Sequence, residues 1–335
     1  MYPFFYRRVL VHLDPERAHT LAVDFLRVMG ASAAGRAVLR RLFAPRPDPR
    51  QVVEVWGIKF PHVLGLAGGF DKRAECLPGL AALGFGHVEI GTITPRPQPG
   101  NPRPRVFRLP EDQALINRMG FPGDGAAAAR AHLERTPRLI PVAVSLGKNK
   151  ETALERAAED YCEVLNTLHP YGDFFTLNIS SPNTPELRRL QTPAYLSELL
   201  GAVQSTMKRL SPKPLLIKIA PDLTWAEIDT ILDLALQHQI AGIVATNTTL
   251  SREGLHSPAQ SENGGLSGLP LRERSTVIIR YIRDRIGDKL GIIGVGGIFN
   301  HTDLQQKLDA GAVLVQAYTG FIYRGMGFVK RCLRP

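Results

Sequence analysis

The sequence predicts an α/β fold, a (β/α)8 barrel of the TIM type that carries an N-terminal extension of two helices. Two observations point to the barrel. Eight short apolar runs follow one another after residue 62, and segments with helical periodicity separate most of them. The runs are apolar at consecutive positions, which is typical of strands buried on both faces of a parallel sheet. The expected strands are Val63–Ala67, His87–Gly91, Val142–Leu146, Phe174–Asn178, Leu215–Ile219, Gly242–Thr246, Ile292–Val295 and Ala312–Gln316.

Helices between these strands complete the pattern. Eight strands spread over about 260 residues agree with the usual length of such a barrel. A doubly wound parallel sheet is the alternative, because a strand count taken from one sequence is approximate. The expected helices are Glu151–His169, Pro193–Leu210, Thr224–His238, Leu271–Ile286 and Thr302–Ala310.

Two short amphipathic helices are expected ahead of the barrel. Asp14 can cap the first helix, Pro15 suits its first turn and Gly30 is expected to end it. The second helix should follow Ser32, with arginines opposite its apolar face. The apolar faces consist of Ala18, Leu21, Ala22, Phe25 and Met29 in the first helix and of Val38, Leu39, Leu42 and Phe43 in the second.

This helical pair has two interpretations. Its basic polar faces, together with the preceding Phe4, Phe5 and Tyr6, resemble an interfacial membrane anchor. The alternative is that both helices simply pack on the main domain, as amphipathic helices of soluble proteins do. Prolines at positions 45, 47 and 49 then mark a linker, and Val52–Phe60 is expected to form a small hairpin.

Composition limits the class of protein. Cys76, Cys162 and Cys332 are far apart, which argues against a structural zinc or a disulfide framework and predicts no metal site. No apolar run reaches the roughly 18 residues of a spanning helix, and the first residues lack the order of a signal peptide. The net charge of +10 favours an anionic ligand, a nucleic acid or a membrane surface. The basic residues form no stripe interleaved with aromatic residues, which speaks against nucleic acid.

Polar side chains or glycines follow nearly every expected strand. The richest such segment, Asn178–Thr184, contains two asparagines, two serines and a threonine. Such groups form ordinary turns, but they also suit the binding of a flat polar ligand. Because the active site of a (β/α)8 barrel lies at the carboxyl ends of its strands, we expect one shared site. The other strand ends are Ala67–Lys72, Gly91–Thr94, Ser145–Asn149, Lys218–Asp222, Thr246–Thr249, Gly294–Ile298 and Tyr318–Gly320.

Two of these ends indicate a bound phosphate. Gly296 and Gly297 follow the seventh strand and Tyr318–Gly320 follows the eighth, where barrels of this kind bind phosphate through backbone N–H groups. Gly264–Gly268, on the loop after the sixth strand, can supply another close approach. A Gly-Gly pair by itself is more often a plain turn. The two neighbouring loops together predict a phosphorylated cofactor.

Two lysines also lie at strand ends. Lys72 follows the first strand, and Lys218 stands inside the apolar run of the fifth. Most lysines are solvated on the surface, but one that points into a barrel must meet negative charge or lose its proton. A reduced flavin, with negative charge near its N1 and O2 edge, is such a partner.

These motifs, in this order and spacing, resemble dihydroorotate dehydrogenase. The resemblance extends from about Tyr6 to the C-terminus and implies FMN-dependent oxidation of (S)-dihydroorotate to orotate in de novo pyrimidine (UMP) biosynthesis. Ser181 and the N-terminal helices resemble the quinone-dependent, membrane-associated class (class 2). The segments that carry the resemblance are Ala67–Lys72, Gly91–Asn101, Asn117–Phe121, Asn178–Thr184, Lys218–Leu223, Ala245–Leu250, Gly264–Gly268 and Gly294–Ile298.

The resemblance also implies roles for individual residues. Ser181 is expected to take the C5 proton of dihydroorotate while a hydride leaves C6 for FMN N5, with Thr184 as part of a proton relay. The substrate is expected to contact Lys72, Asn117, Arg118, Met119, Gly120, Phe121, Asn178, Asn183, Asn247 and Thr248. FMN is expected to contact Gly68, Gly69, Phe70, Asp71, Lys72, Thr92, Ser145, Asn178, Lys218, Thr246, Gly268, Gly297, Tyr318 and Thr319. A quinone tunnel is expected to be lined by His19, Arg108 and Tyr318.

Three positions depart from the family pattern. Ser145 stands where an asparagine usually faces the flavin, although a hydroxyl can still donate a hydrogen bond. Gly68 stands where alanine is usual and Thr319 where serine is usual, and both keep the small size or the hydroxyl.

The expected partners follow from the resemblance. They are dihydroorotate and orotate, a membrane quinone and an anionic leaflet, with no nucleic acid. We expect a monomer that is a peripheral membrane protein on the cytoplasmic side of the cell membrane. Residues 1–44 are expected to form the membrane-associated quinone-tunnel extension and residues 45–335 the FMN-binding barrel.

Two other functions remain possible from the residues alone. A related flavoenzyme that uses fumarate or a nicotinamide partner would carry cysteine at position 181 or work with a second, iron–sulfur chain. A non-catalytic barrel would use its charge to bind nucleic acid or a membrane, and it would take up no flavin.

Overall fold

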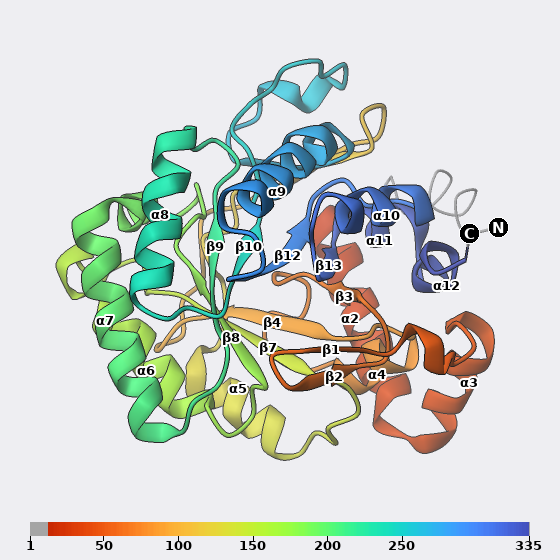
Figure 1. The fold of residues 1–335 in the computed structure, drawn as a ribbon. Helices are drawn as coiled ribbons and strands as arrows, with labels where there is room; N and C mark the ends of the chain where they lie inside the picture. Colours follow the sequence, from red (N-terminus) through yellow and green to blue (C-terminus); the bar gives the residue numbers. More distant parts are fainter. Residues whose placement is uncertain (1–12, 335) are drawn as a thin grey trace.

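A closed barrel of eight parallel strands forms the centre of the computed structural model, which describes residues 13–334 (Figure 1). Around the barrel the strands follow the order β10, β12, β13, β3, β4, β7, β8 and β9. The (β/α)8 prediction is therefore confirmed, and the doubly wound sheet is excluded because that sheet stays open. The strands are β3 (Leu64–Leu66), β4 (Val88–Ile93), β7 (Val142–Leu146), β8 (Phe174–Asn178), β9 (Leu215–Ile219), β10 (Gly242–Ala245), β12 (Gly291–Val295) and β13 (Leu314–Ala317).

The helices around the barrel follow the sequence pattern closely. Thr224 caps α8 and exchanges hydrogen bonds with Glu227, a capping box that fixes the start of this helix. The helix expected from Glu151 starts later, because the carbonyl of Thr152 accepts a hydrogen bond from Lys148 Nζ instead of serving a helical turn. The helices are α4 (Leu77–Ala82), α5 (Gly125–Glu134), α6 (Ala157–Leu168), α7 (Pro193–Leu210), α8 (Trp225–Gln237), α9 (Arg272–Ile286), α10 (His301–Asp309), α11 (Thr319–Arg324) and α12 (Phe328–Cys332).

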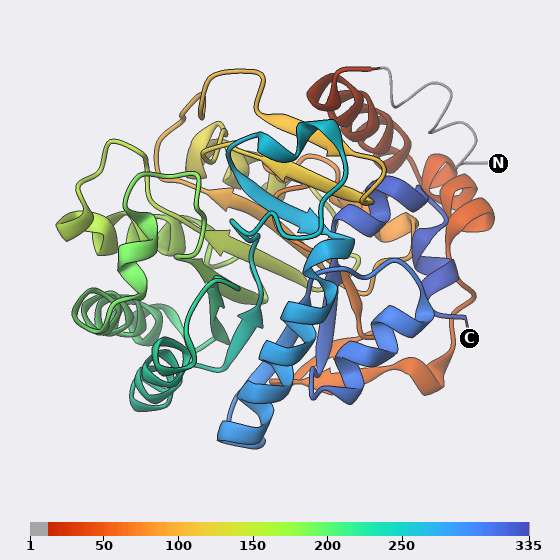
Figure 2. The ribbon, with the colours of Figure 1, turned by 90° about the horizontal axis from the view of Figure 1, so that it is seen from above.

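The two N-terminal helices are α2 (Pro15–Ala31) and α3 (Ala33–Phe43). They lie on the side of the barrel that carries α4 and α12, away from α6 and α7 (Figures 1 and 2). A buried ion pair holds the start of α2, since Arg105 donates to both carboxylate oxygens of Glu16 at 3.0–3.1 Å. The aromatic residues Phe4, Phe5 and Tyr6 lie outside the described residues.

Gly30 does not end α2 as expected. It lies buried in the last turn of the helix, which ends where Ser32 adopts extended backbone and caps α3. A Cβ at Gly30 would lie 2.5 Å from the backbone nitrogen of Gly79 in α4. This glycine therefore allows α2 and α4 to pack closely, and the capping serine sets the end of the helix.

The prediction of which side of α2 is apolar is wrong in part, because this helix has apolar side chains on two sides. Val23 and Leu26 are buried against the barrel, whereas Leu21, Phe25 and Val28 are 61%, 41% and 66% exposed. On α3, only Leu39 is buried, while Val38 and Leu42 are exposed. The two helices thus pack on the main domain and still present an apolar outer surface.

A hairpin closes the amino-terminal end of the barrel. Its strands are β1 (Val53–Val55) and β2 (Ile58–Phe60), as predicted. Phe60 packs edge-to-face on Phe174 at the start of β8, and Trp56 donates its indole N–H to the carbonyl of Ala241.

A three-stranded antiparallel sheet was not predicted. Its strands are β5 (Val106–Leu109), β6 (Ala114–Asn117) and β11 (Gly265–Gly268), with β6 in the middle. The segment expected to be a phosphate-binding loop, Gly264–Gly268, is therefore mostly a strand. Figure 2 shows this sheet on the far side of the barrel from the β1–β2 hairpin, over the carboxyl ends of the strands.

Candidate active site

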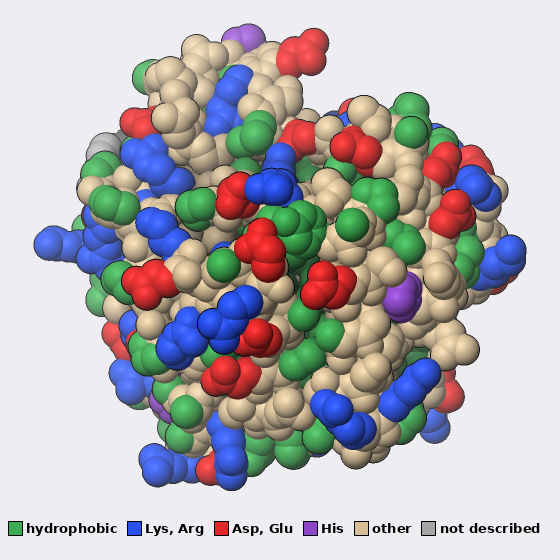
Figure 3. Space-filling model, turned by 90° about the vertical axis from the view of Figure 1, so that its left-hand side faces the viewer, with side chains coloured by type: hydrophobic (Ala, Val, Ile, Leu, Met, Phe, Trp, Pro, Cys, Tyr) green, Lys and Arg blue, Asp and Glu red, His purple; other side chains and the backbone are tan. Residues whose placement is uncertain are grey.

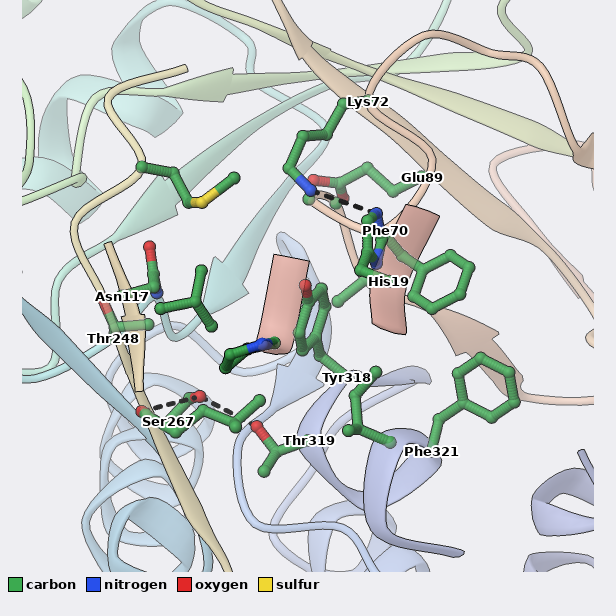
Figure 4. Close-up of a pocket in the computed structure, with 18 of the residues that line it drawn as sticks. His19, Phe70, Lys72, Glu89, Asn117, Thr248, Ser267, Tyr318, Thr319 and Phe321 are labelled. Atoms are coloured by element: carbon green, nitrogen blue, oxygen red, sulfur yellow. Dashed lines mark hydrogen bonds between the residues drawn. The ribbon is translucent and has the colours of Figure 1, made fainter. Parts of the chain in front are cut away.

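A cavity of about 600 Å³ lies at the carboxyl end of the barrel. Residues from all eight barrel strand ends, from the small sheet and from α2 line it. Its size is in the range of small-molecule sites, about 300–1,000 Å³. Of the residues expected to act as base or to contact substrate, FMN or quinone, all but two line this cavity and so lie together. In Figure 4, Asn117 and Thr248 lie on one side of it and the rings of Phe70 and Phe321 on the other.

The two exceptions have structural partners instead. Asp71 accepts the backbone N–H groups of Glu75 and Cys76, and burial raises the pKa of its carboxyl group. Arg118 pairs with Glu262 at 2.7 Å. These side chains shape the loops around the cavity rather than line it.

Ser181 lines the cavity on the loop after β8 and is 6% exposed. Its hydroxyl oxygen accepts the backbone N–H of Asn183 at 3.3 Å. The nearby Thr184 hydroxyl is buried and has no hydrogen-bond partner among the described residues. A serine hydroxyl is a weak base, so a neighbour that passes the proton on is needed if Ser181 is to accept one.

A chain of hydrogen bonds joins four strand ends. Asn247 Nδ2 donates to Asn178 Oδ1 at 3.1 Å and to Ser180 Oγ at 3.0 Å. Asn178 Nδ2 then donates to Thr92 Oγ1 at 2.7 Å, and this hydroxyl lies 2.9 Å from Ser145 Oγ. The chain fixes which way each amide points. Ser145, where the sequence departs from the expected pattern, still takes part through its hydroxyl.

A second set of amides connects the Ser181 loop to the end of β6 and to the loop ahead of β5. Asn183 Nδ2 donates to Asn117 Oδ1 at 3.2 Å, and Asn101 Nδ2 donates to the carbonyl of Asn183 at 2.9 Å. Thr248 donates its backbone N–H to Asn247 Oδ1 at 2.8 Å. The cavity therefore offers both donors and acceptors in fixed positions, which suits a ligand with alternating carbonyl and N–H groups.

Lys218 has a partner that the sequence reasoning missed. Glu89, the second residue of β4 and fully buried, has Oε1 3.5 Å from Lys218 Nζ. Gln316 Nε2 donates to its Oε2 at 3.1 Å. A Cβ at Gly68 would lie 2.5 Å from Glu89 Oε1, so glycine leaves room for this carboxylate. The signal was available, because a glutamate inside an apolar strand run needs a buried partner.

Lys72 is a buried amine that lines the cavity. It has no carboxylate within ion-pair distance among residues 13–334, and burial lowers its pKa to about 8. Its Nζ lies 3.4 Å from Nε2 of His19 in α2 (Figure 4). Burial, and then the charge of Lys72, lower the pKa of His19 to about 3, so the imidazole is neutral. An anionic ligand in the cavity would supply the charge that Lys72 lacks.

The end of the cavity near β12 and β13 is lined by glycines and hydroxyls. Gly268 and Gly297 have φ of 108° and 72°, a region that favours glycine, and a Cβ at Gly297 would lie 2.3 Å from Cβ of Arg272. Thr319 Oγ1 lies 2.8 Å from Ser267 Oγ (Figure 4). Bare backbone and hydroxyl groups at this strand end suit a phosphate.

The opposite wall of the cavity is apolar and is formed largely by α2 and α11. His19 packs edge-to-face on Phe70 at 4.9 Å, and Phe70 contacts the rings of Tyr318 and Phe321. Burial raises the pKa of Tyr318 to about 12. Arg108 donates to the carbonyl of Leu13, just ahead of α2. The three residues expected in the tunnel, His19, Arg108 and Tyr318, thus all line this part of the cavity.

Comparison with protein families gives a match over most of the chain. The model of the dihydroorotate dehydrogenase family matches residues 51–334. A dihydroorotate dehydrogenase (quinone) from a Synechococcus strain is 53% identical over 315 residues, which cover 89% of this chain and 82% of that protein. The enzyme of the same description from Thermus thermophilus is 50% identical over 329 residues, with 97% and 93% coverage.

Solved structures give the same family. The dihydroorotate dehydrogenase of Eimeria tenella in complex with ferulenol superposes with a TM-score of 0.87 at 36% identity, covering 98% of this chain and 92% of that one. Its ligand-free form gives a TM-score of 0.88 at 37% identity, with 95% and 93% coverage.

Proposed function

The chain belongs to the dihydroorotate dehydrogenase family, and from this premise we propose that its cavity binds dihydroorotate beside FMN, with a quinone entering past α2. The protein is an oxidoreductase of pyrimidine biosynthesis that oxidises dihydroorotate to orotate and passes the electrons to a quinone. The observation that carries the site assignment is a cavity that has one polar wall and one apolar wall.

The residues present fit FMN. Glycines at 68, 268 and 297 line the cavity at positions where a Cβ would collide with neighbouring protein atoms, so bare backbone faces the ligand there, and Lys218 supplies a buried cation. The phosphate would lie against Gly268, Gly297 and Thr319, and the flavin ring against Thr92 and Lys218. When bound, FMN supplies the acceptor for the hydride from C6 of the substrate.

The protein's own groups account for binding and proton removal. Lys72 would hold the substrate carboxylate, because it is a buried cation that lines the cavity and has no carboxylate within ion-pair distance in residues 13–334. Asn117, Asn178 and Asn247 would hold the amide and imide edges, since their orientations are fixed by one another. Ser181 would take the C5 proton, with the unpartnered Thr184 hydroxyl next on its path.

The apolar wall supports a quinone site. An electron acceptor dissolved in lipid needs an entrance that faces the bilayer, and α2 carries exposed Leu21, Phe25 and Val28 next to the cavity. In the described part of the chain no helix is long and apolar enough to cross a membrane. The exposed apolar side chains of α2 and α3 support residues 1–44 as a peripheral extension at the membrane surface, and residues 45–335 as the FMN-binding barrel.

The net charge of +10 limits which kinds of partner the protein can bind. On the face of the barrel in Figure 3, basic and acidic side chains are interspersed, with no basic stripe. The charge pattern on this face speaks against a nucleic acid. The net positive charge supports a small anionic substrate and an anionic leaflet on the cytoplasmic side of the cell membrane. We propose a monomer.

The test is anaerobic mixing of the purified protein with dihydroorotate, followed by a short-chain quinone, while the flavin absorbance is recorded. We expect bleaching and then recovery. A flavin that is not bleached refutes the substrate, and bleaching without recovery by quinone refutes the acceptor. A purified protein that takes up no FMN would instead favour the non-catalytic barrel.

A further inference from the structure

One arginine ties the loop that carries Ser181 to two neighbouring strand ends. Arg188 lies on the same loop, in a 3-10 segment over Leu187–Gln191. Its Nε donates to the carbonyl of Ser180 at 3.1 Å. Its two terminal nitrogens donate to Asp222 Oδ2 at 2.8 Å and to the carbonyl of Thr248 at 3.1 Å. The three acceptors follow β8, β9 and β10, so one planar group connects three adjacent strand ends.

We propose that Arg188 is a positioning residue for the oxidation of dihydroorotate, which fixes Ser181 relative to the groups that hold the substrate. This inference rests on the proposed function of Ser181 and Thr248. We call Arg188, Asp222 and the carbonyls of Ser180 and Thr248 the Arg188 brace.

Asp222 is itself fixed by hydrogen bonds from the residues that follow β10. Its Oδ1 accepts the hydroxyl of Thr249, and both its oxygens accept the backbone N–H of Leu250. Arg188 and Asp222 are only 23% and 27% exposed. A guanidinium presents its donors in a rigid plane, and a lysine could not reach three acceptors in different directions.

The residues that the brace holds lie next to the reacting groups. Ser180 precedes Ser181, and its hydroxyl accepts from Asn247. Thr248 lines the cavity. An error of about 1 Å in the position of a catalytic group can cost about a hundredfold in rate. The brace therefore acts on the distance between Ser181 and the C5 proton without touching the substrate.

The loop needs such support because part of its backbone is strained. Glu186 has φ of 54°, a left-handed conformation that non-glycine residues seldom adopt. The loop is held on one side by Asn101, which donates to the carbonyl of Asn183, and on the other by Arg188. Gln191 and Ser180 of this loop each contact one neighbouring strand end, since Gln191 Oε1 accepts the backbone N–H of Ala220 after β9 and Ser180 Oγ accepts from Asn247 after β10. Arg188 contacts both strand ends with one side chain, so its loss removes the link between them.

The test compares Arg188→Gln and Asp222→Asn with Arg189→Gln. Arg189 is the next residue, and its guanidinium forms an exposed ion pair with Glu186. Arg189→Gln therefore removes the same charge from the same loop without changing the brace. Stopped-flow absorbance would give the rate of flavin reduction with unlabelled dihydroorotate and with substrate deuterated at C5 or at C6. Equilibrium dialysis with orotate would give its Kd, and flavin content and Tm would report folding.

Both brace variants should reduce the flavin about ten- to a hundredfold more slowly at saturating substrate. The kinetic isotope effect on flavin reduction should increase for substrate deuterated at C5 and stay the same for substrate deuterated at C6. Only removal of the C5 proton becomes slower, because the substitutions displace the base Ser181 and not the hydride acceptor. The Kd for orotate should change by less than about threefold, and the control should match the parent. The double variant should slow the reaction by less than the product of the two single effects, since both substitutions remove the Arg188–Asp222 ion pair.

Flavin reduction within about twofold of the parent in both folded variants would overturn the brace. A lower rate with unchanged isotope effects would also overturn it, because that pattern indicates a general loss of structure. If Arg188→Gln does not fold, Asp222→Asn decides in the same way. A parent whose flavin dihydroorotate does not bleach overturns the proposed function itself, whereas a bleached parent with unaffected variants overturns the brace alone.

Discussion

The two ends of the barrel are built from the same eight strands and differ in what fills them. At the amino end, the rings of Trp56, Phe60 and Phe174 interlock with the imidazole of His87, which has no hydrogen-bond partner among the described residues. At the carboxyl end, amides and hydroxyls such as Asn178 and Thr92 bond to one another around a cavity. Packed aromatic rings therefore fill the amino end, whereas the carboxyl end encloses a cavity.

This difference separates stability from chemistry. Packed aromatic rings lose water on folding and gain dispersion contacts, so the amino end stabilises the closed barrel. Polar groups around a cavity lose water without equal compensation, and they persist because each has a fixed partner or a ligand to bind. Substitutions at the two ends should therefore change different measurements.

The largest expected effect is at the carboxyl end. Ser181→Ala should keep bound flavin but slow its reduction by dihydroorotate about 10²- to 10⁴-fold, the usual contribution of a general base. Stopped-flow absorbance measures this rate. Ser205→Ala, at an exposed position of α7, is the control and should have no effect. A Ser181→Ala rate close to the parent would remove Ser181 as the base.

At the amino end, the expected loss is in stability. Phe60 is fully buried between Phe174 and His87, so Phe60→Ala should lower the free energy of unfolding by about 3–5 kcal/mol. Urea unfolding followed by circular dichroism measures it, with the half-exposed Val52→Ala as control. The turnover per folded flavin should not change. A fall in turnover at unchanged stability would contradict the division between the two ends.

The charge of Lys72 predicts a pH dependence at the polar end. Burial lowers its pKa to about 8, so the ammonium is present below that pH and lost above it. The Kd for orotate should be constant up to about pH 8 and then rise about tenfold per pH unit, as for the loss of one proton. Lys72→Met should weaken binding at every pH and remove this dependence. A break near the ordinary lysine pKa would show that the amine is not buried in solution.

The smallest expected effect is at the exposed side of α2, where Phe25 lies at the edge of the apolar wall of the cavity. Phe25→Ser should weaken binding to anionic lipid vesicles about tenfold, because one partly inserted aromatic side chain is lost. Flavin reduction by dihydroorotate should stay the same. Val277→Ser, at an exposed apolar position of α9, is the control for vesicle cosedimentation. Equal binding by both variants would mean that α2 does not face the membrane.

The sequence reached the barrel and most of the site for a physical reason. Strands buried on both faces leave long apolar runs, and groups such as Lys72 and Asn178 stand out where those runs end. Since all parallel strands present their carboxyl ends on one side, these groups had to meet. The small sheet of β5, β6 and β11 was missed because its strands have four residues each and lack a continuous apolar run: Arg108 lies in β5, Asn117 ends β6, and β11 begins and ends with glycine.

By itself the sequence determined the succession of strands along the chain, the motifs that follow them, the polar residues of the site and the family resemblance. Only the tertiary structure decided their partners. It placed Glu89 against Lys218, His19 against Lys72 and Arg188 against Asp222, contacts between residues distant in the chain. It also decided which side of α2 is buried, because a helix that is apolar on two sides takes its orientation from what it packs on. Local pattern specifies the elements, whereas the pairing of side chains depends on how the elements come together.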